Sequence, residues 1–224
     1  MIKWLEDAVF YEVYPQSFRD SNGDGIGDIP GITEKLEYIQ ELGCNALWIN
    51  PCFTSPFYDA GYDVEDYYSV APRYGTNEDL KKLFEAAHQR GMHVLLDLVP
   101  GHTAVTHPWF QESMKAEKNE YTDRYVWTDS LYKRMEDVKG IVSVLRGISP
   151  RPASCGVNCF STQPALNYGF ANITDAGWQQ PTDAPGPMAT REELKNIMRF
   201  WLTLGCDGFR VDMAGSLVKN DEDK

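Results

Sequence analysis

The chain has 224 residues, of which 42% are hydrophobic and 24% charged, so it can bury the core of one domain, or of one domain with an insertion. Its formal net charge of −12 predicts a surface that repels nucleic acid and anionic membranes, and neither is expected as a partner. The sequence shows no signal peptide and no apolar run near the ~20 residues that span a bilayer, which favours a cytoplasmic location. Five cysteines at no metal-ligand spacing fit a reduced protein, in which Cys155 and Cys159 are the one plausible pair.

The predicted elements repeat one unit, an amphipathic helix followed by a glycine and an apolar strand. An opening strand lies in VFYEVYP, and the three units follow it: ITEKLEYIQELG with CNALWINP, NEDLKKLFEAAHQRG with MHVLLDLVP, and TREELKNIMRFWLTLG with CDGFRVDMAG. Gly43, Gly91 and Gly205 stand where a helix commonly ends in a left-handed residue, and Asn77 and Thr190 are predicted N-caps. Four strands alternating with helices predict an α/β protein with a parallel sheet. This pattern alone does not separate a doubly wound sheet from a (β/α)8 barrel.

The spacing of the units is uneven. Gly91 and Gly205 are more than twice as far apart as Gly43 and Gly91, and the surplus, roughly residues 103–189, is rich in Pro, Gly, Trp and Tyr. We interpret it as an insertion after the third strand, because barrel enzymes build their sites from loops at the carboxyl ends of strands.

Polar side chains gather at those strand ends. Asn50 follows one strand, Asp97 and His102 follow the next, and Arg210 and Asp212 lie in the last. Arg210 and Asp212 are two positions apart, so on a strand both point to the same face. A carboxylate beside a guanidinium stays ionised, which suits a nucleophile, although a structural ion pair explains the pattern equally well.

The segment DSNGDGIGD, residues 20–28, places oxygen-bearing groups at alternate positions, as a Ca²⁺ loop does. Its candidate ligands are Asp20, Asn22, Asp24, the carbonyl of Ile26, and Asp28. An Asx-rich turn that caps the following helix is the alternative.

Several ordered segments resemble the conserved blocks of the α-amylase family, glycoside hydrolase family 13. DLVPGH (residues 97–102) looks like the first block and GFRVDMAG (residues 208–215) like the second, while QPALN (residues 163–167) is similar to the QPDLN of oligo-1,6-glucosidase-like members. FYEVYPQSF and GYDVEDYYSVAPRYGTNEDL also match that branch, so the resemblance covers nearly the whole chain.

The resemblance implies a (β/α)8 barrel with a small domain B after strand three. It divides the chain into residues 1–102 (strands one to three), 103–189 (domain B) and 190–224 (helix and strand four). It also implies a retaining hydrolase that forms a covalent glycosyl-enzyme intermediate. Asp212 would be the nucleophile and Arg210 would orient it, while His102 would donate a hydrogen bond to the sugar and Asp97 would support the first block.

The same resemblance extends to specificity and to metal binding. SPFYDAGYD matches a glucosidase loop in which Asp59 would grip the terminal glucose and Tyr62 would stack beneath it, giving exo-action on short α-glucosides. A plain turn at a strand end is the alternative. The branch also binds Ca²⁺, or Mg²⁺, through the loop at residues 20–28, which favours a structural metal there without a catalytic role.

Two departures from the family pattern matter. Gly101 replaces the asparagine usual before the histidine, and nothing after Asp212 supplies the acid/base glutamate, which is expected beyond the end of this chain. The chain is therefore expected to be half a catalytic domain, inactive or incomplete alone, that associates with its missing half or with itself. A transglycosylase, such as a trehalose synthase or a sucrose-acting relative, and a non-catalytic amylase-like interaction protein remain the alternatives.

Overall fold

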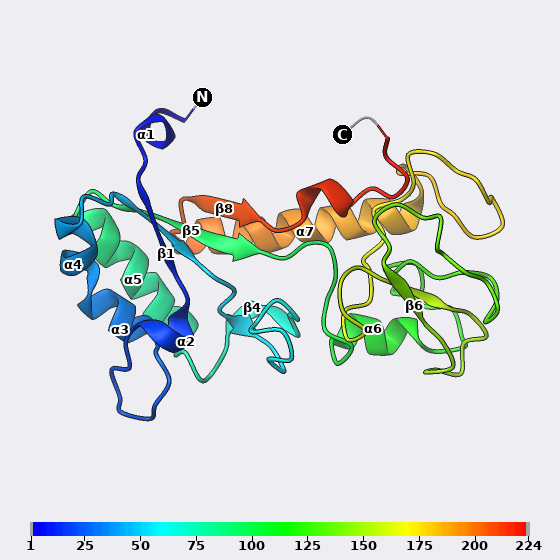
Figure 1. Cartoon of the computed structure of the whole chain (residues 1–224), viewed down its shortest axis with the longest axis horizontal. Coiled ribbons are helices and arrows are strands. Elements are labelled where there is room, and N and C mark those ends of the chain that lie inside the picture. The colour runs from blue at the N-terminus through cyan, green and yellow to red at the C-terminus, as the bar shows by residue number, and fades with distance from the viewer. Residues whose placement is uncertain (1, 223–224) are drawn as a thin grey trace. The chain divides into compact units, whose positions relative to one another are not determined.

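The computed structural model describes residues 2–222, and the chain divides into two compact units (Figure 1). Unit 1 comprises residues 1–54, 66–98 and 197–210, and unit 2 comprises residues 55–65, 99–196 and 211–224. Among the residues described, no helix combines the length and the apolar character that crossing a membrane requires.

Unit 1 is built on a parallel sheet with the strand order β1-β2-β5-β8. Its strands are β1 (Phe10–Val13), β2 (Ala46–Ile49), β5 (His93–Leu98) and β8 (Gly208–Val211). Ala46 pairs with Phe10 on one side and with His93 on the other, both in parallel register. Most residues of β2 and β5 are buried, as expected for central strands covered on both faces. The predicted α/β parallel sheet is thereby confirmed.

Three of the helices around this sheet end just before the glycines that were predicted to follow them. They are α1 (Lys3–Glu6), α2 (Pro15–Phe18), α3 (Ile29–Glu34), α4 (Leu36–Glu41), α5 (Asn77–Gln89) and α7 (Pro185–Leu204), whose last residues belong to unit 1. Gly43, Gly91 and Gly205 take φ values of 87°, 68° and 124°, so the predicted left-handed residues after three helices are confirmed.

Both predicted N-caps were wrong. Thr76 caps α5 instead of Asn77, because its hydroxyl accepts the Asp79 N–H and the Asp79 carboxylate accepts the Thr76 N–H, a complete capping box. The Asn77 side chain instead binds the Val70 N–H and the Tyr68 carbonyl. The last helix begins at Pro185, because proline in a first turn loses no helical hydrogen bond, and Thr190 lies within it.

A small antiparallel pair, β3 (Phe53–Thr54) and β4 (Asp66–Val70), completes unit 1. Trp201 of α7 is fully buried against it. Its ring stacks on Phe53 at 5.1 Å and its indole N–H donates to the Tyr67 carbonyl at 2.8 Å. Trp201 therefore fixes the stretch of α7 that belongs to unit 1, because its ring is packed and its indole N–H is hydrogen-bonded.

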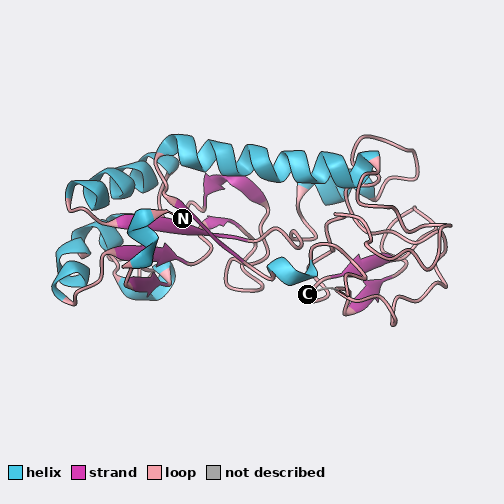
Figure 2. Ribbon diagram, turned by 90° about the horizontal axis from the view of Figure 1, so that it is seen from above, coloured by secondary structure: helices cyan, strands magenta, loops and turns pink. Residues whose placement is uncertain are grey.

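Unit 2 is mostly irregular backbone (Figure 2). Its core is rich in aromatic side chains. Its regular elements are α6 (Pro108–Ser113), the hairpin β6 (Ser143–Leu145) and β7 (Cys155–Val157), the 3-10 turn η1 (Ala214–Ser216) and the first residues of α7. Phe110 stacks on Trp127 and meets the edge of Tyr125, and all three are buried. Side-chain packing and scattered backbone bridges, rather than an extended sheet, hold this unit together. The five cysteines, all within the residues described, are free thiols.

Candidate active site

An ion pair at the carboxyl ends of two neighbouring strands dominates unit 1. Arg210 on β8 donates to both carboxylate oxygens of Asp97 on β5, at 3.1 and 3.2 Å. The Asp97 side chain is fully buried, whereas that of Arg210 is 36% exposed. The Trp48 indole N–H donates to Asp97 at 3.0 Å, and its ring lies 4.8 Å from the guanidinium carbon. Asp97 thus accepts hydrogen bonds from Arg210 and Trp48, and nothing in the sequence pattern had predicted the contact with Trp48.

In unit 2, His102 is buried and both of its ring nitrogens face oxygen atoms. Nδ1 lies 2.9 Å from the side-chain oxygen of Asn158, and Nε2 lies 3.0 Å from the Tyr62 carbonyl. Burial lowers the pKa of His102, and the opposing influences are these two hydrogen bonds and the carboxylates of Asp212 and Asp59. The Asp59 and Asp212 carboxylates both raise the pKa of this imidazole, so both lie near it. Asp59, His102, Asp212 and the Tyr62 backbone all belong to unit 2.

The loop that carries Asp59 and Tyr62 is organised by a buried carboxylate. Asp63 has no exposed surface and accepts hydrogen bonds from the Ser55 hydroxyl at 2.9 Å, the Tyr58 N–H at 2.8 Å and the Asp59 N–H at 3.1 Å. Phe57 and Ala60 take left-handed φ values of 60° and 51°, a costly conformation for residues with a Cβ. The Asp63 hydrogen bonds hold this strained loop in one shape.

The Asp59 carboxylate has a fixed direction as well. The fully buried Gln163 donates to it at 2.7 Å and accepts the Phe160 N–H through its own side-chain oxygen at 2.8 Å. This second bond orients the Gln163 amide, so its NH₂ must face Asp59. Gln163 belongs to the QPALN block, and nothing in that block predicted its contact with Asp59.

Asp212 follows the end of β8 rather than lying within it. The next residue, Met213, takes a left-handed φ of 44° and opens η1. The turn therefore sets the direction of the Asp212 side chain, whereas the sequence interpretation placed Arg210 and Asp212 on one strand face.

The loop at residues 20–28 satisfies much of its own hydrogen bonding. Asp20 accepts N–H bonds from Gly23 and Gly25, which lower its pKa, and Asp28 caps α3 by accepting the Gly31 N–H at 2.7 Å. Asn22 and Asp24 likewise accept N–H groups two positions ahead. Among residues 2–222, no three Asp, Glu, His or Cys side chains converge as a metal cage would require. The helix-capping alternative is therefore confirmed for Asp28. The carboxylate oxygens of the loop still have free lone pairs, and such oxygens are the ligands that Ca²⁺ binds.

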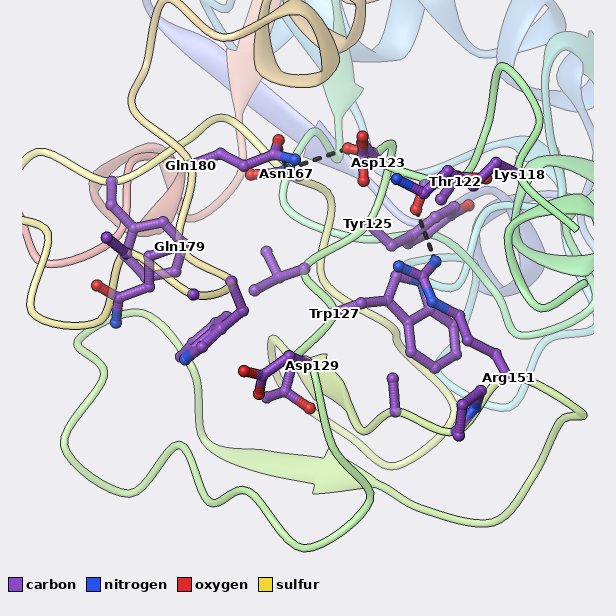
Figure 3. Close-up of a pocket in the computed structure, with 18 of the residues that line it drawn as sticks. Lys118, Thr122, Asp123, Tyr125, Trp127, Asp129, Arg151, Asn167, Gln179 and Gln180 are labelled. Atoms are coloured by element: carbon purple, nitrogen blue, oxygen red, sulfur yellow. Dashed lines mark hydrogen bonds between the residues drawn. The ribbon is translucent and has the colours of Figure 1, made fainter. Parts of the chain in front are cut away.

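A cavity of about 550 Å³ opens elsewhere in unit 2 (Figure 3). Trp127, with the Arg151 guanidinium 4.6 Å from its ring, forms part of its wall, and Asp129, Asn167 and Gln180 lie around it. None of the residues predicted to bind sugar or metal lines this cavity. The cavity therefore does not mark the predicted site.

The four parallel strands follow one another in chain order, with polar side chains at their carboxyl ends and an irregular insertion, as in the first part of a (β/α)8 barrel. The chain belongs to the α-amylase family: the profile of the alpha amylase catalytic domain matches residues 12–224.

Similar proteins span several activities. The chain is 38% identical to an oligo-1,6-glucosidase of Bacillus sp. (strain F5), over 98% of this chain and 40% of that protein. It is 42% identical to a trehalose synthase/amylase of Mycolicibacterium smegmatis, over 97% of this chain and 35% of that one. An isomaltulose synthase of Erwinia rhapontici, solved with its substrate sucrose, matches 96% of this chain and 36% of its own, with a TM-score of 0.79 and 35% identity. The chain thus spans well under half the length of these relatives, and the predicted barrel fold, with only its first part present, is confirmed.

Proposed function

We propose that the protein to which this chain belongs is a retaining enzyme that acts on the terminal α-glucosyl residue of short oligosaccharides. The observation that carries the proposal is the gathering of Asp59, His102 and Asp212 in unit 2, with Asp59 oriented by Gln163. A fixed carboxylate that accepts hydrogen bonds from terminal sugar hydroxyls leaves no room for further sugar on that side. Exo-action follows from this arrangement.

In the proposed reaction the Asp212 carboxylate attacks the anomeric carbon as the bond to the leaving oxygen breaks, giving a covalent glycosyl-enzyme. Arg210 would orient Asp212, and Asp97 in turn holds Arg210. His102 and Tyr62 would bind the glucosyl ring. The proton for the leaving oxygen would come from a glutamate beyond residue 224, and water or a second sugar would then take the glycosyl group.

The test is release of a phenol from an aryl α-glucoside with a good leaving group, which departs with little help from an acid. We expect release by this chain to fall by about 10³-fold or more in Asp212→Asn, because the nucleophile is lost. Equal release by both proteins would contradict the role of Asp212. No release from either would assign the activity to the longer protein, where the same substitution repeats the test.

Glycosyl transfer is the second candidate, because the relatives include a trehalose synthase/amylase and an isomaltulose synthase. Hydrolysis and transfer share the glycosyl-enzyme and differ in what takes the sugar from it. Products formed from maltose and from sucrose would separate them: glucose indicates hydrolysis, and an isomeric disaccharide indicates transfer. A non-catalytic interaction protein is disfavoured by the presence of Asp212. Self-association of the chain stays a prediction.

We also propose a structural Ca²⁺, with Mg²⁺ as the alternative, held by the side chains of Asp20, Asn22, Asp24 and Asp28 and the carbonyl of Ile26. At about 100 times its Kd a ligand of the folded state adds about 2.7 kcal/mol of stability. We therefore expect CaCl₂ to raise the Tm by about 5 °C relative to EDTA. Asp24→Asn removes the charge of one proposed ligand and should reduce this increase in Tm. Asp24 caps no helix, so the substitution should change the Tm in EDTA little. An equal Tm in CaCl₂ and in EDTA would contradict the proposed metal site.

A further inference from the structure

Asn158 occupies the space that a side chain at position 101 would need. Gly101 has no Cβ, and one built there would overlap the side-chain oxygen of Asn158. Asn158 is only 1% exposed, so its amide has little room to move aside. The backbone of Gly101 is outside the left-handed region, so the need for glycine comes from this close approach and not from φ. The absence of a side chain at position 101 and the presence of asparagine at position 158 therefore depend on each other.

The orientation of the Asn158 amide follows from its partners. Its NH₂ lies 3.4 Å from the Gly140 carbonyl, which can only accept, and 3.2 Å from the Ser216 hydroxyl. That hydroxyl donates to the Met213 carbonyl at 2.9 Å, so it must accept from Asn158. The side-chain oxygen of Asn158 then lies 2.9 Å from His102 Nδ1, while the other ring nitrogen, Nε2, faces the Tyr62 carbonyl.

These contacts form a chain from His102 Nδ1 through Asn158 and Ser216 to the Met213 carbonyl. Its two ends are the predicted sugar-binding imidazole and the strained residue that follows the predicted nucleophile. Met213 needs such support, because a left-handed φ is costly for a residue with a long side chain.

We propose that Asn158 is a positioning residue of the sugar site, one that binds His102 Nδ1 and ties the imidazole to the turn after Asp212. The proposal rests on the function proposed above, since that function gives His102 and Asp212 their roles. Asn158 belongs to the insertion, and its amide lies against both Gly101 and His102. Gly101 is small so that this amide can reach the imidazole.

A double-mutant cycle tests the shared space. Gly101→Ala should push the Asn158 amide off His102, and Asn158→Ala should remove it, so each should lower the Tm by about 4 °C. The double variant should be no less stable than Asn158→Ala alone, since the added Cβ then has space. Gly177→Ala is the matched control, because a Cβ there meets only the ends of the Asp175 and Asp129 side chains. Additive losses at positions 101 and 158 would overturn the proposal.

The ¹⁵N resonances of the His102 ring give a readout that a purely structural role would leave unchanged. Asn158→Ala and Gly101→Ala should both shift the Nδ1 signal, because each removes the contact of Asn158 with that nitrogen. Ser216→Ala cuts the chain beyond Asn158 and should leave that signal in place. An Nδ1 signal unchanged in Asn158→Ala would overturn the proposal. None of these measurements uses a substrate, so failure here is distinguishable from loss of phenol release, which tests Asp212.

Discussion

Replacing Arg210 with methionine should destabilise the protein more than replacing Asp97 with asparagine, although both changes break the same ion pair. The two partners differ in exposure: the Asp97 side chain is fully buried and that of Arg210 is 36% exposed. Without Arg210, the buried carboxylate keeps the Trp48 N–H as a donor but loses its cation. Stranding a buried charge costs about 3–5 kcal/mol. Without the Asp97 charge, water can solvate the guanidinium, and we expect about 1–2 kcal/mol.

Urea unfolding followed by circular dichroism would measure both losses, and the double variant provides the control. Asp97→Asn combined with Arg210→Met removes both charges, so it should recover much of the stability lost in Arg210→Met alone. If Asp97→Asn were the more damaging change, the pair would depend on a role of Asp97 beyond its charge. If the two losses simply added, the two side chains would not interact in solution.

The sheet of unit 1 was predictable because its information is local. Three of its four strands follow a glycine that ends a helix, and the apolar runs themselves mark buried strands. Where long-range contacts decide, the prediction failed. The helix expected to start near Ile32 is two helices, α3 and α4, joined at Lys35. Strand β3 gave no signal, since a two-residue strand has no periodicity to read.

The candidate site divides in the same way. Sequence blocks pointed to Asp59, His102 and Asp212, which lie together in unit 2, yet they said nothing of how these side chains are held. Asn158 is 56 positions from His102, and nothing in its own neighbourhood announces that contact. The one available signal was the unusual Gly101, because a missing side chain at a site implies that another group fills the space.

Three buried polar side chains therefore define the geometry of unit 2 near the proposed sugar site. Gln163 orients the Asp59 carboxylate, Asn158 binds the His102 imidazole, and Asp63 holds the loop between residues 55 and 63. Each is buried, and each has at least two hydrogen bonds with defined donors. Networks of this kind cost much when half broken, since the partner left behind is buried without a bond. The loop held by Asp63 offers the sharpest test.

Asp63→Ala should loosen the loop that carries Asp59 and Tyr62. The substitution leaves the N–H groups of Tyr58 and Asp59 and the Ser55 hydroxyl without their acceptor. Bonds to a charged group contribute about 1.5–3 kcal/mol each, and the strained backbone at Phe57 and Ala60 would then relax. Hydrogen exchange at the Tyr58 and Asp59 amides should accelerate by roughly 30- to 100-fold.

The matched variants show whether charge and shape both matter. Asp63→Asn keeps one accepting oxygen but turns an NH₂ group toward one of the loop's own donors, so exchange at Tyr58 and Asp59 should accelerate by an intermediate factor. Asp66→Ala removes a similar carboxylate, one that accepts the Tyr68 N–H at 2.8 Å in unit 1, and should leave both amides unchanged. Unaltered protection in Asp63→Ala would mean that contacts other than this carboxylate hold the loop. Protection lost at Tyr58 and Asp59 but kept at β5 would establish Asp63 as the residue that preorganises the loop carrying Asp59 and Tyr62.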